Sequence, residues 1–182
     1  AGVPLDQSFV ETTAGELRRQ WDTNVFSLVM LTKLALPALI DSRGVVINIG
    51  STAGHFSIPG WGMYFSTKVS VRSVSDSLRR ELRAYGVRVA LVEPGPYATE
   101  FGARAGMQTS QSGLPPAAVA RVIVKLAARP RAVATVPWYF GPLVNLGGAL
   151  TALAPGLVDL VFFAIGARNL RKQQEQQGAA GA

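Results

Sequence analysis

Cysteine is absent from this sequence of 182 residues, and His55 is its only histidine. Without cysteine the chain can form neither a disulfide framework nor a thiolate metal site. A single histidine also leaves too few nitrogen ligands for a typical zinc site. The sequence therefore predicts no metal centre.

Charged residues are also sparse, at 16% of the chain, whereas hydrophobic residues make up 48%. This composition is far from that of disordered proteins and, at this length, is typical of one domain with a buried core. The net charge is +7, but the basic residues are scattered over several predicted elements without the interleaved aromatic residues of a single-strand binder. We expect no nucleic-acid partner.

A basic leader followed by an apolar run and a small-residue cleavage site is missing from the start of the sequence, which favours a cytoplasmic location. An uncharged run, 132–158, has the length of a membrane span. Helix-breaking residues interrupt it, including Pro137, Pro142 and Pro155. We interpret the apolar stretch 138–165 as buried or as a peripheral membrane contact, and not as a spanning helix.

Alternating helical and strand patterns indicate an α/β protein. Thr13 and Glu16 form a capping box at a helix start, and apolar residues continue that helix to about Leu39. Pro37 is expected to bend or end its last turn. The β-branched run 45–49 then has the pattern of a strand buried on both faces of a parallel sheet. Further along, the patterns predict a helix at 63–85, a strand at 87–92, a helix at 116–128 and a strand at 132–136.

A strand, a helix and a strand in this order imply a right-handed parallel crossover. We therefore expect a doubly wound parallel sheet with helices on both faces, a three-layer α/β/α arrangement. Residues 1–166 form a single domain in this interpretation, with 136–166 as its apolar carboxyl-terminal segment. The remaining residues, 167–182, are polar and are predicted to be a disordered tail.

Three residues form the candidate reaction centre. Ser51 follows the strand 45–49, so its hydroxyl lies at the carboxyl end of a strand, where open parallel sheets bind ligands. Tyr64 follows on the next predicted helix, and Lys68 lies one turn beyond it on the same face. The ammonium is expected to lower the pKa of Tyr64 from its ordinary value of about 10. Tyr64 then becomes a general acid or base, and Ser51 a hydrogen-bond donor to the same substrate oxygen.

The same residues also have ordinary structural interpretations. A tyrosine and a lysine one turn apart occur on many solvated helices, and a serine after a strand is common. A serine hydrolase is a second interpretation of Ser51, because His55 lies nearby. Gly50 directly precedes the serine, however, so the G-x-S-x-G motif is incomplete. We interpret His55 as a loop residue that lies beside the substrate entrance or is simply exposed.

Four motifs, together with their order along the chain, resemble those of the classical short-chain dehydrogenase/reductases. They are Asn24-Val25, Ser51, the segment Tyr64-Phe-Ser-Thr-Lys68, and Pro94-Gly95-Pro-Tyr-Ala-Thr99. The resemblance implies that Ser51, Tyr64 and Lys68 are catalytic, and that Tyr64 and Lys68 also bind a nicotinamide cofactor, NAD or NADP. It further implies an oxidoreductase that interconverts a carbonyl and an alcohol.

By the same resemblance, Asn24 is a fourth catalytic residue, which interrupts a helix and holds a water molecule next to the lysine. Pro94, Gly95 and Thr99 belong to a loop that contacts the nicotinamide and the phosphates. In the family, the segment corresponding to 136–166 caps the substrate, and its apolar character here predicts a lipophilic small-molecule substrate. Family members commonly form dimers or tetramers through the helices that carry the Asn24 and Tyr64 positions, which predicts a homo-oligomer.

The resemblance begins at Ala1-Gly2, which is similar to the second half of the family's Asn-Asn-Ala-Gly motif, and continues to about residue 136. The glycine-rich cofactor loop that precedes this motif in the family has no counterpart in the sequence. We therefore expect an incomplete Rossmann-like sheet, the carboxyl-terminal part of the family's domain. We also expect weak or no cofactor binding by these 182 residues alone.

A non-catalytic remnant that acts by binding, including at a membrane surface through 138–165, is the alternative function. The sequence leaves open the substrate, the direction of reaction, the choice between NAD and NADP, and whether Ala1 is a true start.

Overall fold

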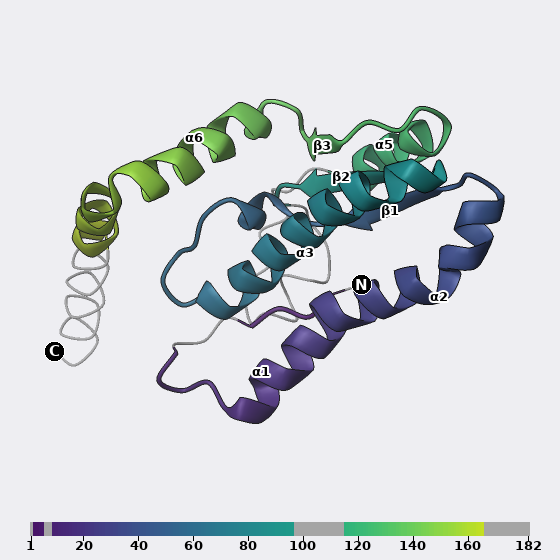
Figure 1. The fold of residues 1–182 in the computed structure, drawn as a ribbon. Helices are drawn as coiled ribbons and strands as arrows, with labels where there is room; N and C mark the ends of the chain where they lie inside the picture. The colour runs from purple at the N-terminus through teal and green to yellow at the C-terminus, as the bar shows by residue number, and fades with distance from the viewer. Residues whose placement is uncertain (1, 6–8, 97–114, 166–182) are drawn as a thin grey trace, which may run out of the picture.

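The computed structural model describes residues 2–5, 9–96 and 115–165, and these are organised around a parallel sheet (Figure 1). Its strands are β1 (Val45–Ile49), β2 (Arg88–Pro94) and β3 (Val133–Val136), in the order β1-β2-β3. The register places Ile49 of β1 beside Val92 of β2. Because parallel strands end at the same edge of a sheet, the residues that follow β1 and β2 are neighbours.

Helices cover both faces of this sheet. On one face, α5 (Ala117–Ala128) packs against Ala90 and Val92 of β2. On the other face, Val89 packs with side chains of the first long helix and of α3 (Gly62–Glu81). Successive strand residues point to opposite faces, so alternate residues of β2 serve the two helical layers. The predicted α/β/α arrangement is therefore confirmed.

The first long helix has three parts: α1 (Ala14–Trp21), a π-helical turn (Asp22–Phe26) and α2 (Ser27–Asp41). It begins with the predicted capping box. The backbone N–H of Glu16 donates to Thr13 Oγ1, and the Thr13 N–H donates to Glu16 Oε2 at 2.8 Å. Two otherwise unsatisfied amides of the first turn are thereby paired.

Pro37 does not end α2, and the bend predicted there as the alternative stays a prediction. The helix continues through the proline to Asp41, and the Gly44 N–H then donates to the Leu39 carbonyl at 2.9 Å. By length and composition the whole segment Ala14–Asp41 meets the criteria for a membrane span, as core helices of soluble proteins also do.

Both faces of β1 are packed, as predicted: Ile47 and Ile49 lie against the core cluster on the α5 face, and Val46 lies against the cluster on the other face. Among the described residues β1 is the edge strand of the sheet, and only Asn48 is fully buried in it. A strand with no described neighbour on one side keeps part of its surface exposed, so most residues of β1 are only partly buried.

α3 ends as predicted. It passes into a 3-10 turn (Leu82–Tyr85) and stops at Gly86, whose φ of 75° lies in the left-handed region that favours glycine. β2 begins directly afterwards.

The apolar segment after β3 forms α6 (Phe140–Leu153) and a second helix, Pro155–Ile165, with a bend of 110° between them. In Figure 1 the two helices lead away from β3 toward the end of α3 that carries its first turn. α6 approaches the loop after β1 closely: a Cβ atom added at Gly148 would lie only 2.7 Å from the backbone oxygen of His55. The predicted tail, 167–182, lies outside the described residues, and the domain boundary at 166 stays a prediction.

Candidate active site

Ser51 and Tyr64 meet at the carboxyl edge of the sheet. Ser51 follows β1 and Gly50, and its extended backbone begins the 3-10 turn Thr52–Gly54. Its Oγ accepts a hydrogen bond from the Ala53 N–H at 3.1 Å. The Ser51 side chain also hydrogen-bonds to Tyr64, in the first turn of α3. The fold therefore brings together two hydroxyls that are distant in sequence.

Tyr64 lies in a water-poor environment. It is 8% exposed, and its ring packs edge-on against Trp61 and Phe65. Burial raises the pKa of Tyr64 to about 12, and the hydrogen bond with Ser51 lowers it only in part. The predicted lowering of this pKa by Lys68 is wrong in this structure, because the loss of phenolate hydration outweighs the favourable interactions. Tyr64 is consequently a neutral phenol near pH 7.

Lys68 lies one turn beyond Tyr64, with its Nζ 5.5 Å from the centroid of the tyrosine ring. The residue is only 6% exposed, and burial lowers its pKa to about 8. Within the described part of the chain, its ammonium has no hydrogen-bond acceptor and no ion pair. A buried ammonium without a hydrogen-bond acceptor is unfavourable. This position is therefore suited to a ligand that brings hydroxyl groups.

Asn24 lies in the π-helical turn, which interrupts the first long helix. Its Oδ1 accepts from the Val3 N–H at 2.7 Å, and its Nδ2 donates to the Val3 carbonyl at 3.0 Å and to Thr67 Oγ1 at 3.1 Å. Gly2 packs between Asn24 and Lys68, since an added Cβ would lie 3.3 Å from Oδ1 and 3.5 Å from Nζ. Asn24 thus joins the first described segment to α3, and its role as a water ligand stays a prediction.

Pro94 and Gly95 leave the sheet beside the loop that carries Ser51. Thr52 Oγ1 donates to the Pro94 carbonyl at 3.4 Å, and the Gly95 N–H donates to the carbonyl of Val136 at 2.9 Å. Phe140 covers Gly95, because an added Cβ would lie 3.1 Å from its ring. Thr99, the third predicted loop residue, lies outside the described residues.

Of the two alternatives predicted for His55, the exposed loop residue is wrong. Its side chain is 5% exposed, and its Nε2 lies 3.0 Å from Oε2 of Glu93 and 3.0 Å from Nη1 of Arg72. Arg72 also donates to Glu93 Oε1. Burial alone would raise the pKa of Glu93, but the hydrogen bonds and charges of His55 and Arg72 hold it below its ordinary value. The sequence-based predictions did not include this cluster. The one signal for it in the sequence is Glu93, an acidic residue in an otherwise apolar strand core.

This placement also weakens the serine hydrolase interpretation. A serine nucleophile needs a neighbouring base, and the only histidine of the chain has its ring nitrogen Nε2 next to Glu93 and Arg72. No group of histidine, aspartate or glutamate side chains among the described residues could hold a metal ion.

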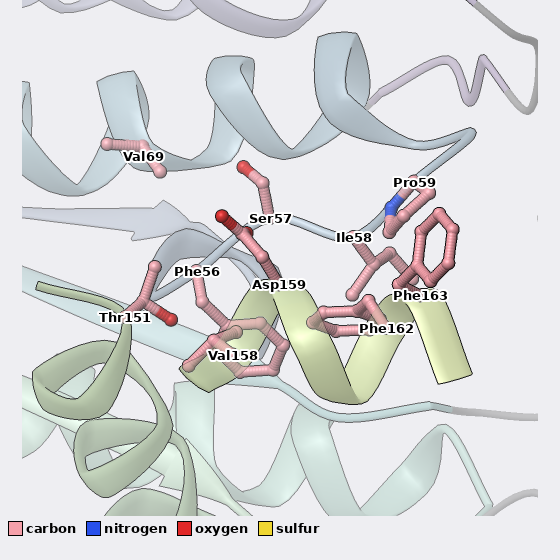
Figure 2. A pocket seen from close by; sticks show the side chains of 10 residues that line it. All are labelled: Phe56, Ser57, Ile58, Pro59, Val69, Thr151, Val158, Asp159, Phe162 and Phe163. Carbon is pink, nitrogen blue, oxygen red and sulfur yellow. The ribbon is translucent and has the colours of Figure 1, made fainter. Parts of the chain in front are cut away.

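An apolar pocket of about 850 Å³ lies between the loop after the 3-10 turn, α3 and the helix Pro155–Ile165. Figure 2 shows the rings of Phe162 and Phe163 on that helix gathered beside Ile58 and Pro59. The remaining lining residues are Phe56, Ser57, Val69, Thr151, Val158 and Asp159. The pocket has the apolar character that suits the hydrocarbon part of a ligand.

The arrangement of these side chains suits proton transfer at an uncharged substrate oxygen. A serine hydroxyl and a tyrosine phenol share a hydrogen bond in a site with little water, and an ammonium lies one helical turn away. Such donors stabilise negative charge that develops on a substrate oxygen. Neighbouring elements add Asn24, whose Nδ2 donates to Thr67 of α3, and Pro94, whose carbonyl accepts from Thr52.

Known proteins are similar to this chain in both sequence and fold. The family model for short chain dehydrogenases matches residues 1–109, more than half of the chain. The chain is 47% identical over 110 residues to an NADPH-dependent 3-dehydrocapnine reductase from Ornithobacterium rhinotracheale. The match covers 58% of this chain and 39% of that protein. The chain is 30% identical over 189 residues to dehydrogenase/reductase SDR family member 7B from Bos taurus, with 97% of this chain and 56% of that protein covered.

Among solved structures, a short-chain dehydrogenase from Sphingobium yanoikuyae in complex with NADPH superposes with a TM-score of 0.72 at 28% identity. The match covers 84% of this chain and 61% of that one, and it confirms the Rossmann-like α/β fold. This chain spans between 39% and 56% of the length of the two curated relatives. Since the family model matches more than half of its residues, the chain belongs to the short-chain dehydrogenase family.

Proposed function

We propose that the protein containing this chain is an NAD- or NADP-dependent oxidoreductase that interconverts a carbonyl and an alcohol. The observation that carries the proposal is the hydrogen-bonded pair of half-buried Ser51 and buried Tyr64, with the buried ammonium of Lys68, which has no hydrogen-bond acceptor among the described residues, one turn away. Family membership supports it, and so does the NADPH in the related solved structure.

The residues present fit a nicotinamide cofactor. Lys68 is buried without an acceptor of its own in the described part of the chain, so ribose hydroxyls would supply the partners that its ammonium needs. Pro94 and Gly95 end β2 at the same edge of the sheet and would line the nicotinamide side, with Thr99 as a further proposed contact. When bound, the nicotinamide supplies or accepts the hydride.

The protein side chains handle the proton. With a pKa raised to about 12, Tyr64 holds its proton at neutral pH and can donate it to the oxygen of a carbonyl that is being reduced. Ser51 donates a hydrogen bond to the same oxygen and limits its negative charge. In the oxidation direction the roles reverse: Tyr64 must first lose its proton, the positive charge of Lys68 favours the resulting phenolate, and the phenolate then accepts the proton of the alcohol. Asn24 holds α3 to the first described segment and, by the family resemblance, places a water molecule near Lys68.

The substrate we propose is lipophilic. The pocket is lined mainly by apolar side chains, with Ser57, Thr151 and Asp159 as its polar members. Phe56 connects it with the catalytic helix, because its ring centroid lies 6.2 Å from that of Phe65, the neighbour of Tyr64. The hydrocarbon part of a substrate would occupy this pocket while its carbonyl lies at Ser51 and Tyr64.

A series of unbranched aldehydes or ketones of increasing chain length tests both the activity and the substrate class. In the full-length protein, kcat/KM should rise about 4-fold for each methylene that enters the pocket, since burial of one methylene contributes about 0.8 kcal/mol. The Phe162→Ala variant should reduce this gain while short substrates react as before. Turnover that does not depend on chain length would contradict the lipophilic substrate, and absence of turnover across the series would contradict the activity.

Exposed apolar side chains support two proposals on partners. The first long helix exposes Phe26, Leu31 and Leu34, a surface that a second copy of the chain would cover in a homo-oligomer. The helix Pro155–Ile165 exposes Leu160 and Phe163, which supports a peripheral membrane contact as the alternative, non-catalytic function. Sedimentation of the protein with liposomes would favour the membrane contact, and a dimer or tetramer in light scattering would favour the oligomer.

A further inference from the structure

A buried carboxylate lies directly behind the candidate active site. Glu93, the last residue of β2 before Pro94, is only 1% exposed. One carboxylate oxygen accepts from Arg72, and the other lies 3.0 Å from His55 Nε2 and accepts from Thr135 Oγ1 at 3.3 Å. Four elements therefore converge on a single acidic side chain.

His55 and Arg72, two of the partners of Glu93, each lie close in sequence to a proposed catalytic residue. His55 directly follows the 3-10 turn that begins at Ser51, and Arg72 lies one turn beyond Lys68 on α3. The two elements also touch, because a Cβ added at Gly54 would lie 3.0 Å from the Lys68 carbonyl. The carboxylate of Glu93 thus holds the loop that carries Ser51 against the helix that carries Tyr64 and Lys68.

The charge at this position is not required for burial. The other β2 core residues, from Val89 to Val92, are apolar, and an apolar side chain would fill the same layer without the loss of carboxylate hydration. A buried ion pair fixes directions as well as distances, because charge-assisted hydrogen bonds need defined geometry. The Ser51 hydroxyl needs such a fixed position, since its hydrogen bond with Tyr64 depends on the conformation of a short loop.

We propose that Glu93, bridging His55 and Arg72, is a positioning residue that fixes the hydroxyl of Ser51 against Tyr64. The inference rests on the proposed function, because it concerns the reaction at that pair. Glu93 does not touch substrate or cofactor in this role; it acts through the turn Thr52–Gly54 and through His55.

The test is a double-mutant cycle in the full-length protein. Glu93→Gln keeps the shape of the side chain but removes its charge, so kcat should fall by about 10- to 100-fold, as small misplacements of catalytic groups produce. KM for the cofactor should not change. In a Ser51→Ala background the same substitution should lower kcat by less than about 2-fold, since coupled residues are non-additive. A loss of equal size in both backgrounds would show a general structural effect and overturn the inference.

A control variant and a substitute for Glu93→Gln complete the experiment. Asp76→Asn removes another carboxylate of α3 that is paired with arginine, at 3.0 Å from Arg79, and should leave kcat unchanged. If Glu93→Gln fails to fold, His55→Gln replaces it in the cycle, because this change leaves the pair of Glu93 and Arg72 in place. An effect of His55→Gln that persists without the serine hydroxyl would contradict the proposal. A wild-type protein without turnover would instead contradict the proposed function itself.

Discussion

Replacement of Tyr64 by phenylalanine should lower kcat of the full-length protein by a factor of about 10² to 10⁴, the usual contribution of a positioned proton donor. The affinity for the nicotinamide cofactor should stay close to that of the wild type. The reason is that the substitution removes one hydroxyl from a buried ring that otherwise keeps its packing against Trp61 and Phe65. Turnover is followed through cofactor absorbance, and affinity through cofactor fluorescence.

Tyr85→Phe is the matched control, because this tyrosine lies in the 3-10 turn after α3 and is exposed. It should have no effect on kcat. Retention of activity in Tyr64→Phe would contradict the assignment of the proton donor, and loss of cofactor affinity in the same variant would show that the hydroxyl acts chiefly in binding.

Replacement of Lys68 by methionine should make the cofactor-free protein more stable and, at the same time, weaken cofactor binding. Burial lowers the pKa of Lys68 from 10.5 to about 8, so its charged form is disfavoured in the folded state by roughly 3 kcal/mol. Methionine fills a similar volume without a charge. At pH 7, denaturant unfolding should therefore give a free energy of unfolding about 2 to 3 kcal/mol higher for Lys68→Met.

The free energy of unfolding of the wild type should also change with pH, in the direction that the lowered pKa of Lys68 sets. Between about pH 8 and 10.5 the unfolded chain still binds the proton that the folded protein has lost, so the wild type should become more stable as pH rises. Lys68→Met lacks this rise, and the difference between the two proteins should shrink. Above about pH 10 the wild-type curve turns down, since the unfolded chain ionises its tyrosine before Tyr64 ionises in the folded state. A methionine variant that is less stable at pH 7 would contradict a buried ammonium that has no hydrogen-bond acceptor among the described residues.

The pattern of helices and strands was accessible from the sequence because each element has its own period and its own end signals. The capping box at Thr13 and the left-handed glycine at Gly86 set the limits of two helices as expected. The spacing of Tyr64 and Lys68 placed both on one face of α3, and the strand before Ser51 placed the serine at the carboxyl edge. These inferences need only local periodicity and the geometry of a parallel sheet.

The electrostatics of the site depended on contacts that no local pattern contains. The pKa of Tyr64 is set by Trp61, Phe65 and the packing around them, so the effect of the nearby lysine alone gave the wrong direction. His55 and Glu93 are far apart in the sequence, and only the pairing of β1 with β2 and the docking of α3 bring them together. The burial of a charged group is therefore a property of the assembled layers.

β1 shows a second limit of local patterns. Its apolar residues correctly indicated packing on both faces, but their pattern did not show that the strand lies at the edge of the described sheet. Periodicity identifies a strand and its faces, whereas its place in the sheet depends on the other strands that are present.

Transfer of deuterium from the C4 position of a labelled reduced nicotinamide to a carbonyl substrate tests the central claim most directly. With the full-length protein and a lipophilic ketone, mass spectrometry should find one deuterium on the carbinol carbon, and Tyr64→Phe should abolish its incorporation while Tyr85→Phe does not. An alcohol product without the label, or no product with any carbonyl of the chain-length series, would contradict hydride transfer at the site formed by Ser51, Tyr64 and Lys68.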